Sequence, residues 1–320
     1  MKRLCSNLLF AVLILFLLPG QTLAAEFLIP GGQIIGLQLQ NDTVTVAAFD
    51  DVLGANARES GLKIGDKILS IDGKTVACAD DVRSALGEKS LSLTVLRDGK
   101  QKSLQITPCQ TDDGPRLGIH LKQGITGIGT VTWYDPGTGI FGTLGHGVSD
   151  SGGRLLTMTR GSAYTAEVIS VKKGERGEPG LLKGSAEAMS VCGTLMRNTP
   201  QGVFGVTKQG WQGKPLPTAD YDEIQTGPAA IRSTVAGSTV QEYSVEILKI
   251  YPEHRPDGRN FLLKVTDPEL LSKTGGIVQG MSGSPIIQDG KLVGAVTHVL
   301  VNDPTRGYGI FIENMLTAAS

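Results

Sequence analysis

The sequence predicts a mostly β protein that folds as two globular units. Glycine contributes 43 of the 320 residues, nearly twice the usual ~7%, and charged residues contribute only 19%. Short runs in which apolar and polar residues alternate are separated by Gly and Asp-Gly turns, a pattern typical of strands joined by tight hairpins. At roughly 150 residues per domain, the length favours two domains. These observations exclude a coiled coil and a helical bundle.

The chain carries almost no net charge. Its 30 Lys and Arg residues are balanced by 31 Asp and Glu residues, for a net charge of −1. Where basic residues gather, as over residues 172–178, acidic residues lie between them. Because no region offers a positive field, we expect no nucleic-acid partner.

Residues 1–25 have the layout of a secretory signal. Lys2 precedes an apolar run over residues 8–18, and two small residues follow at positions 24–25. A helix of that run rises only ~16 Å, short of the ~30 Å hydrocarbon core, so we expect export followed by cleavage. Counted over residues 4–20, the stretch approaches a spanning length, which leaves a retained membrane anchor as the alternative.

Cysteine and cofactor signals are sparse. Outside the N-terminal segment lie Cys78, Cys109 and Cys192, an odd number that makes no disulfide framework. A bridge between Cys78 and Cys109 is compatible with an exported chain, and buried thiols are the alternative. The sequence contains no Cys-x-x-Cys, no His-Glu-x-x-His and no phosphate-binding loop, so we predict no metal site and no cofactor.

The first expected unit extends over residues 26–110 and ends at a polar stretch with turn chemistry, residues 111–115. Alternating runs at 35–40 and 43–47 predict strands. A short helix is predicted at 79–86, where apolar residues recur three and four positions apart and a glycine follows.

This unit resembles a PDZ domain of the type associated with bacterial proteases. The resemblance covers residues 28–108 and rests on the order of the elements and on segment 60–73, Ser-Gly-Leu-Lys-Ile-Gly-Asp-Lys-Ile-Leu-Ser-Ile-Asp-Gly. It implies that a peptide adds a strand to an open edge beside a glycine-containing loop, here Gly31-Gly32. The residues expected to bind the peptide are Ile35, Gly36, Leu37, Gln38 and Leu39. Alternatively, the glycines only form a tight turn beside a packed strand.

The second expected unit, residues 117–320, again has the pattern of β structure. Residues 127–134 alternate, and residues 140–144 form the returning strand after a turn. Near the C-terminus, two apolar runs flank Asp289-Gly290, a strong signal for a two-residue hairpin. Several short strands joined by glycine turns predict a sandwich or a barrel.

Segment 280–285, Gly-Met-Ser-Gly-Ser-Pro, directly precedes that hairpin. A nucleophilic serine needs a tight turn that presents its hydroxyl, and backbone N–H groups that converge on the substrate carbonyl oxygen. We therefore predict Ser282 as the nucleophile and the amides of Gly280 and Ser282 as the oxyanion hole. The turn and hairpin resemble the nucleophile region of chymotrypsin-like serine proteases, which implies a double β-barrel. A Gly/Ser loop without catalysis is the alternative.

A serine hydroxyl needs a general base, and the chain offers four histidines. His120 falls within an alternating strand, and His254 falls within a loop bounded by prolines. His146 stands between two glycines at a strand end, a position that often carries functional side chains, so we predict it as the base. His298, on the strand after the nucleophile hairpin, is the second candidate.

The third member of a triad must accept the other imidazole N–H. Asp267 ends an apolar strand 15 residues before Ser282, so we predict it for this role. Its alternative role is an ordinary turn or helix-cap residue. Asp150 lies only four residues after His146, too close in sequence to orient the ring easily. The remaining acidic candidates lie in turn-like contexts: Asp135, Asp220, Asp222 and Asp303.

Three motifs together carry a narrower resemblance. Leu-Gly-His-Gly-Val at 144–148, Thr-Asp-Pro at 266–268 and Val-Gln-Gly-Met-Ser-Gly-Ser-Pro at 278–285 resemble the stage IV sporulation protein B peptidases of endospore-forming bacteria. The resemblance implies export from the forespore into the space between the two sporulation membranes. There, members cleave themselves and a regulatory protein that restrains an intramembrane metalloprotease, which releases a late sigma factor. The catalytic residues that the resemblance implies are His146, Asp267 and Ser282.

We therefore expect an exported serine endopeptidase with a PDZ-like domain followed by a chymotrypsin-like double β-barrel. Its expected partners are a peptide or protein substrate and, through the PDZ-like domain, a second copy of the chain. Association with a membrane through the N-terminus belongs to the anchor alternative. Two other functions stay open: an exported PDZ scaffold whose protease-like domain is inactive, and a general quality-control protease.

Overall fold

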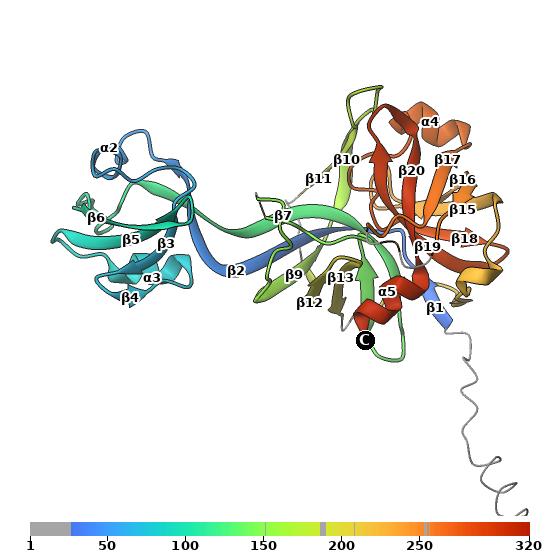
Figure 1. Cartoon of the computed structure of the whole chain (residues 1–320), viewed down its shortest axis with the longest axis horizontal. Coiled ribbons are helices and arrows are strands. Elements are labelled where there is room, and N and C mark those ends of the chain that lie inside the picture. Colours follow the sequence, from blue (N-terminus) through green and yellow to red (C-terminus); the bar gives the residue numbers. More distant parts are fainter. Residues whose placement is uncertain (1–26, 151, 186–189, 208, 253–254, 256) are drawn as a thin grey trace, which may run out of the picture.

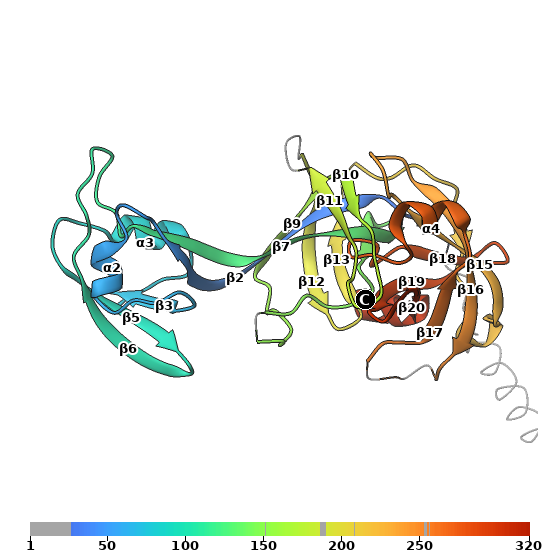
Figure 2. The same ribbon diagram turned by 90° about the horizontal axis from the view of Figure 1, so that it is seen from above.

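The chain is described by a computed structural model that covers residues 27–320 except 151, 186–189, 208, 253–254 and 256. The expected signal or anchor and His254 lie outside the described residues. Within the described part, no helix has the length and apolar character needed to cross a bilayer. Two lobes are joined by a long two-stranded ribbon (Figure 1), and the view from above shows the same separation (Figure 2).

Six strands of the larger lobe close into a first barrel. In ring order they are β2 (Ile34–Phe49), β7 (Ile119–Tyr134), β8 (Ile140–Thr143), β13 (Gly202–Val206), β12 (Val191–Thr199) and β9 (Arg160–Thr165). Neighbouring strands are antiparallel, and β2 completes the ring because it pairs with both β7 and β9. Four short strands lie outside the ring: β1 (Phe27–Pro30), β10 (Glu167–Lys172), β11 (Leu181–Ser185) and β14 (Leu216–Pro217).

A second closed barrel follows in the chain. In ring order its strands are β15 (Gly227–Ser233), β16 (Gln241–Ile250), β17 (Phe261–Val265), β20 (Asp303–Phe311), β19 (Lys291–Leu300) and β18 (Pro285–Gln288). Asp289 and Gly290 join β18 to β19 with φ values of 50° and 77°, the left-handed pair that a two-residue hairpin requires. The remaining elements are the 3-10 turn η1 (Tyr221–Glu223), α4 (Pro268–Thr274) and α5 (Ile312–Ala319).

The two barrels pack through a shared apolar cluster. Burial of apolar side chains between two β units is the main force that holds them together. The first barrel and β1 contribute Leu28, Trp133 and Phe204, and the second barrel with α5 contributes Leu292, Ala295, Ile310, Ile312 and Met315.

The smaller lobe is an insertion in the chain between strands β2 and β7 of the first barrel. Strands β2 and β7 leave the barrel paired with each other and continue into the lobe, where Val44 of β2 also pairs with Ile68. We call residues 42–122 the inserted lobe. Its other elements are α2 (Ala55–Glu59), β3 (Lys67–Ile71), β4 (Lys74–Thr75), α3 (Ala79–Ala85), β5 (Leu91–Arg97) and β6 (Lys100–Ile106).

The inserted lobe has its own core and its own buried ion pair. A separate apolar cluster fills it, with Ile68, Leu93 and Val95 almost fully buried. Asp66 is buried and accepts two hydrogen bonds of 2.6 Å from the Arg97 guanidinium. Burial raises the pKa of Asp66, but the hydrogen bonds from Arg97 and from the Lys63 amide outweigh this effect, so the pKa lies below its ordinary value.

The expected domain boundaries differ from this arrangement. The PDZ-like unit was expected over residues 26–110, yet Ile35 pairs with Gly129 and Thr165 inside the first barrel. Residues 27–40 therefore belong to the larger lobe, together with the expected peptidase unit 117–320. Because one continuous strand serves both lobes, its alternation pattern contains no break that could mark the boundary.

Candidate active site

The turn that carries Ser282 is clamped between the barrels. The Ser282 carbonyl accepts from the Thr130 amide of β7 at 2.9 Å, and the Thr130 hydroxyl donates to the Gly280 carbonyl at 2.8 Å. Gly283 has φ of +96°, and a Cβ there would lie 2.0 Å from the Thr130 oxygen. Only glycine fits this position, which brings the nucleophile turn of the second barrel against the first barrel.

Two amides of this turn face away from the protein's own acceptors. The amides of Met281, Gly283 and Ser284 each donate to a backbone carbonyl. Among the described residues, the amides of Gly280 and Ser282 have no acceptor. Two unpaired donors beside a serine are what an oxyanion hole needs, so both amides are available for the role predicted from the sequence.

His146 reaches the same place from the end of β8. Leu144 and Gly145 both adopt left-handed φ values, 69° and 68°, which reverse the chain just before the histidine. A Cβ on Gly145 would lie 2.9 Å from the Thr297 side chain, so the close contact of the two barrels requires glycine. His146 and Ser282 line one cavity of about 240 Å³.

The imidazole of His146 is held in the form that a general base needs. Its Nδ1 lies 2.9 Å from the Gly147 carbonyl oxygen, which can only accept a hydrogen bond. The proton therefore sits on Nδ1, and Nε2 keeps its lone pair. Burial lowers the pKa of His146, and the Gly147 carbonyl opposes this effect only in part, so the ring is neutral at pH 7.

The hydroxyl of Ser282 is hydrogen-bonded to a group other than His146. Its Oγ donates to the Thr297 carbonyl at 2.7 Å, and no hydrogen bond joins Ser282 to His146 in the described structure. Catalytic hydrogen bonds are often incomplete in a protein without substrate. A rotation of the serine side chain is therefore needed before proton transfer.

His298, the second candidate for the base, lies beside the first. Its ring centroid is 5.0 Å from that of His146, and its buried Nδ1 has no hydrogen-bond partner in the described structure. Burial, His146 and Arg259 together lower its pKa to about 4, and Asp257 opposes them. His298 is therefore a neutral neighbour of His146, and it does not line the cavity that holds Ser282.

Asp267 is not brought to this site. Its carboxylate caps α4, where Oδ1 accepts from the Leu270 amide at 2.9 Å and Oδ2 accepts from the Ser244 amide at 3.3 Å. The strand register places Leu262 level with His298, and Asp267 lies five residues beyond it, roughly 16 Å at ~3.3 Å per residue. In this structure Asp267 therefore has the helix-cap role, and its triad role stays a prediction. In the described structure, His146 Nδ1 contacts the Gly147 carbonyl.

The expected peptide-binding strand has no open edge. Residues Ile35, Gly36, Leu37, Gln38 and Leu39 pair with β7 on one side and with β9 on the other. A strand that is paired on both sides cannot accept a peptide strand, so this prediction is wrong.

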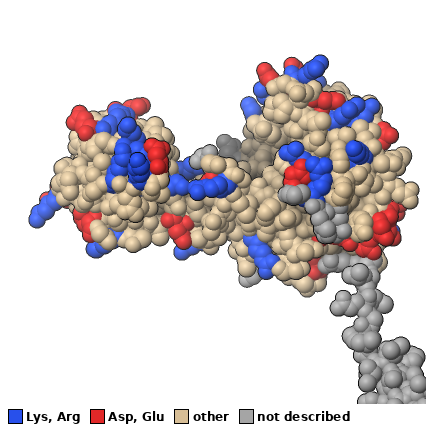
Figure 3. All heavy atoms as spheres, in the orientation of Figure 1, with Lys and Arg blue, Asp and Glu red and all other residues tan. Residues whose placement is uncertain are grey.

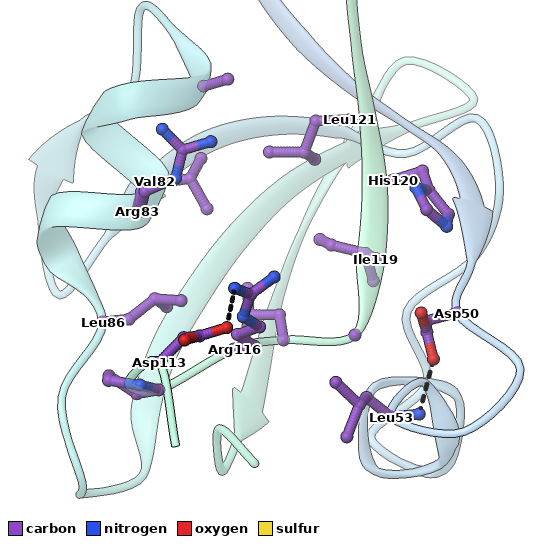
Figure 4. A pocket seen from close by; sticks show the side chains of 14 residues that line it. Asp50, Leu53, Val82, Arg83, Leu86, Asp113, Arg116, Ile119, His120 and Leu121 are labelled. Atoms are coloured by element: carbon purple, nitrogen blue, oxygen red, sulfur yellow. Dashed lines mark hydrogen bonds and ion pairs between the residues drawn. The ribbon is translucent and has the colours of Figure 1, made fainter. Parts of the chain in front are cut away.

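An open edge exists elsewhere in the inserted lobe. The start of β7, at Ile119 and Leu121, pairs with β2 on one side and faces α3 across a groove of about 610 Å³ (Figure 4). Arg83 and Arg116 lie on its walls, and the exposed His120 lies at its rim. Since the second unit is expected to begin at residue 117, the sequence analysis does not assign this edge to the PDZ-like unit.

The remaining expectations concern the cysteines, a metal site and the surface charge. Cys78, Cys109 and Cys192 are free thiols, and burial raises the pKa of Cys192. Among the described residues, no group of three or more His, Cys, Asp or Glu side chains is placed to hold a metal ion. Acidic and basic side chains are interspersed over the face shown in Figure 3.

Comparison with protein families gives two matches. A model described as SpoIVB peptidase S55 matches residues 113–316, and a model of the PDZ domain matches residues 34–107. The two matches together cover both lobes, including the groove and the cavity with His146 and Ser282.

Individual relatives match shorter stretches. A candidate zinc metalloprotease of Rhizobium meliloti is 38% identical over 100 residues, 30% of this chain and 26% of that protein. One from Agrobacterium fabrum is 35% identical over 77 residues, 23% of this chain and 20% of that protein. The chain thus spans about a quarter of the length of these curated relatives.

Solved structures give weaker likenesses. Two crystal structures of the Rv3671c protease in an inactive form, one of them a serine-to-alanine mutant from M. tuberculosis H37Rv, share 13% identity with this chain. They match with TM-scores of 0.36 and 0.33 over 60% of this chain and 84% and 81% of theirs. Scores this low carry no argument about the present site.

Proposed function

This chain belongs to the SpoIVB peptidase S55 family, and we propose that it is an exported endopeptidase that cleaves itself and a regulatory protein during sporulation. At the coarser level it is a serine peptidase with a PDZ domain. The observation that carries the proposal is the shared cavity in which a neutral His146 and Ser282 meet two unpaired backbone amides.

The geometry supports acyl transfer in the following steps. Ser282 rotates away from the Thr297 carbonyl, and His146 Nε2 takes its proton as the oxygen attacks the substrate carbonyl carbon. The resulting oxyanion accepts hydrogen bonds from the Gly280 and Ser282 amides. The protonated imidazole then gives its proton to the leaving amine, and water releases the acyl group by the same path.

The groove between α3 and β7 is the proposed site at which the PDZ lobe binds a peptide, from a substrate or from a second copy of the chain. Its free strand edge supports addition of a peptide strand. Two arginines also lie in its walls, where Arg83 pairs with Asp80 and Arg116 pairs with Asp113. Replacing residues 42–122 by an Asn-Gly turn tests this role. We expect cleavage of a protein substrate to fall while covalent labelling of Ser282, which reports an intact barrel pair, persists.

Export and self-cleavage rest on the sequence of residues 1–25 and on the family, since those residues lie outside the described structure. The proposed location is the space between the forespore and mother-cell membranes, with the N-terminus removed or kept as an anchor. The mass and N-terminal residue of the mature full-length chain, beside its Ser282→Ala variant, separate the two events. Signal removal occurs in both proteins, whereas self-cleavage occurs only in the wild type.

A fluorophosphonate probe tests directly whether Ser282 is an active nucleophile. We expect an adduct on Ser282 of the full-length chain and none in Ser282→Ala. Absence of labelling together with intact peptide binding would support the inactive scaffold. Broad cleavage of many unrelated peptides would support a general quality-control protease.

A further inference from the structure

The cavity beside the nucleophile has an apolar side that the proton-transfer chemistry does not use. It lies at the open mouth of the first barrel, where β2 and β7 leave toward the inserted lobe. We call this side the barrel-mouth pocket, and its lining residues are Leu37, Leu39, Ile125, Gly127, Leu144 and Val148.

The pocket exists because one strand position lacks a side chain. Gly127 of β7 pairs directly with Leu37 of β2, and a Cβ built on Gly127 meets no atom within 4 Å. At Gly129, two residues further along the same face, a Cβ would lie 2.3 Å from the Leu144 side chain. Gly129 is buried and its position is filled, whereas Gly127 is exposed and its position is open at the barrel mouth.

The chemistry of the walls selects the kind of group that fits. Leu37 and Leu39 are almost fully buried in the core of the first barrel, and none of the lining residues carries a formal charge. A charged group placed there would lose its hydration without gaining a partner. The volume of about 240 Å³ is below the range of pockets for drug-sized ligands, so there is room for one side chain.

We propose that the barrel-mouth pocket binds an apolar substrate side chain, of the size of leucine or phenylalanine, next to the scissile bond. Ser282 and His146 border the same cavity, so a side chain seated there belongs to a residue that flanks the attacked carbonyl. This inference rests on the proposed peptidase function and adds the substrate class. The pocket discriminates by burial: each CH₂ group contributes about fourfold, hence roughly 50-fold for leucine over alanine.

Peptide cleavage by the full-length protein tests this inference. The substrates are peptides randomised on both sides of the cleaved bond, followed by pairs that differ only by Leu, Ala or Asp at the selected position. We expect one flanking position to be enriched in aliphatic or aromatic residues, with Leu over Ala near 50-fold in kcat/KM and Asp not cleaved. Gly127→Val fills the empty position and should reduce the Leu/Ala ratio at least fivefold.

A matched control is available in the inserted lobe. Gly87 also has open space at its Cβ and no left-handed φ. It follows α3 in the inserted lobe and does not line the cavity, so Gly87→Val should leave the Leu/Ala ratio unchanged. If Gly127→Val does not fold, Gly127→Ala adds one carbon and should give a smaller reduction.

The outcomes separate the inference from the function it rests on. Cleavage with no apolar preference at any position, or a Leu/Ala ratio that Gly127→Val or Gly127→Ala leaves intact, overturns the inference while the peptidase function stands. Absence of both peptide cleavage and fluorophosphonate labelling of Ser282 overturns the two together.

Discussion

Replacing Asp267 by asparagine distinguishes a helix cap from a catalytic carboxylate. In the structure, the Leu270 and Ser244 amides donate to the Asp267 side chain. Asparagine keeps an oxygen acceptor and is as good an N-cap as aspartate, so only the attraction between the negative charge and the helix N-terminus is lost, ~0.3–1 kcal/mol. We expect Asp267→Asn to lower the free energy of unfolding by at most about 1 kcal/mol.

Asp267→Ala removes the acceptor as well as the charge. The lost cap is worth ~0.5–2 kcal/mol, so this variant should be the less stable of the two. Urea unfolding followed by far-UV circular dichroism measures both values. If Asp267→Asn lowers the free energy of unfolding more than Asp267→Ala does, the helix-cap role is contradicted.

The kinetic prediction is sharper, because the two roles differ by orders of magnitude. When a triad aspartate is replaced by asparagine, kcat falls by ~10⁴ because the imidazole tautomer is wrong. Here the Gly147 carbonyl holds the Nδ1 proton of His146, so kcat of Asp267→Asn on a peptide should stay within about twofold of wild type. A fall of a hundredfold or more, with an unchanged unfolding midpoint, would refute the reasoning.

Three further predictions follow from the same contacts. Burial lowers the pKa of His146 below its usual ~6.5, and the neutral ring is the active form. The value of kcat/KM should therefore be constant at neutral pH and decline only below pH ~6.5. A decline centred above pH ~7 contradicts this. Gly283→Ala should reduce kcat at least ~10²-fold, since its Cβ would press on the Thr130 carbonyl and shift the oxyanion donors; near-normal kcat would show that the turn can relax. Asp66→Asn should destabilise the inserted lobe by ~3 kcal/mol through the unpaired Arg97, seen as faster proteolysis within residues 42–122; unchanged resistance argues against the ion pair.

Features of the chain that depend on short-range pattern were predictable. Asp289-Gly290 forms the expected hairpin, and the glycines around Ser282 and His146 shape the turns that present these side chains. Each of these features is specified within a few residues, because left-handed φ values are accessible to few residue types. The mostly β character follows for the same reason.

Features that depend on which strands pair were not predictable. The alternation along β2 is the same in the barrel as in the inserted lobe, so it contains no sign that Leu37 and Val46 belong to different lobes. Whether an edge is open depends on distant strands, which is why the peptide was expected to pair with residues 35–39 of β2 and not with the start of β7. Pairing between distant segments is set by the whole fold and not by local sequence.

The role of Asp267 had a local signal that points to the cap. Asp followed by Pro at the first helical position and Glu in the first turn is a helix start signature, and α4 begins there. Its place at a strand end 15 residues before Ser282, together with the family resemblance, favoured catalysis instead. No local pattern indicates that a backbone carbonyl, that of Gly147, holds the imidazole proton.

A crystal structure of the fluorophosphonate adduct of the full-length chain tests the catalytic geometry most directly. The account predicts a bond from Ser282 Oγ to phosphorus, a phosphonyl oxygen about 2.7–3.1 Å from the amides of Gly280 and Ser282, and His146 Nε2 within hydrogen-bonding reach of Oγ. An adduct whose oxygen points away from both amides, or whose imidazole stays out of reach while Asp267 approaches it, would contradict the account.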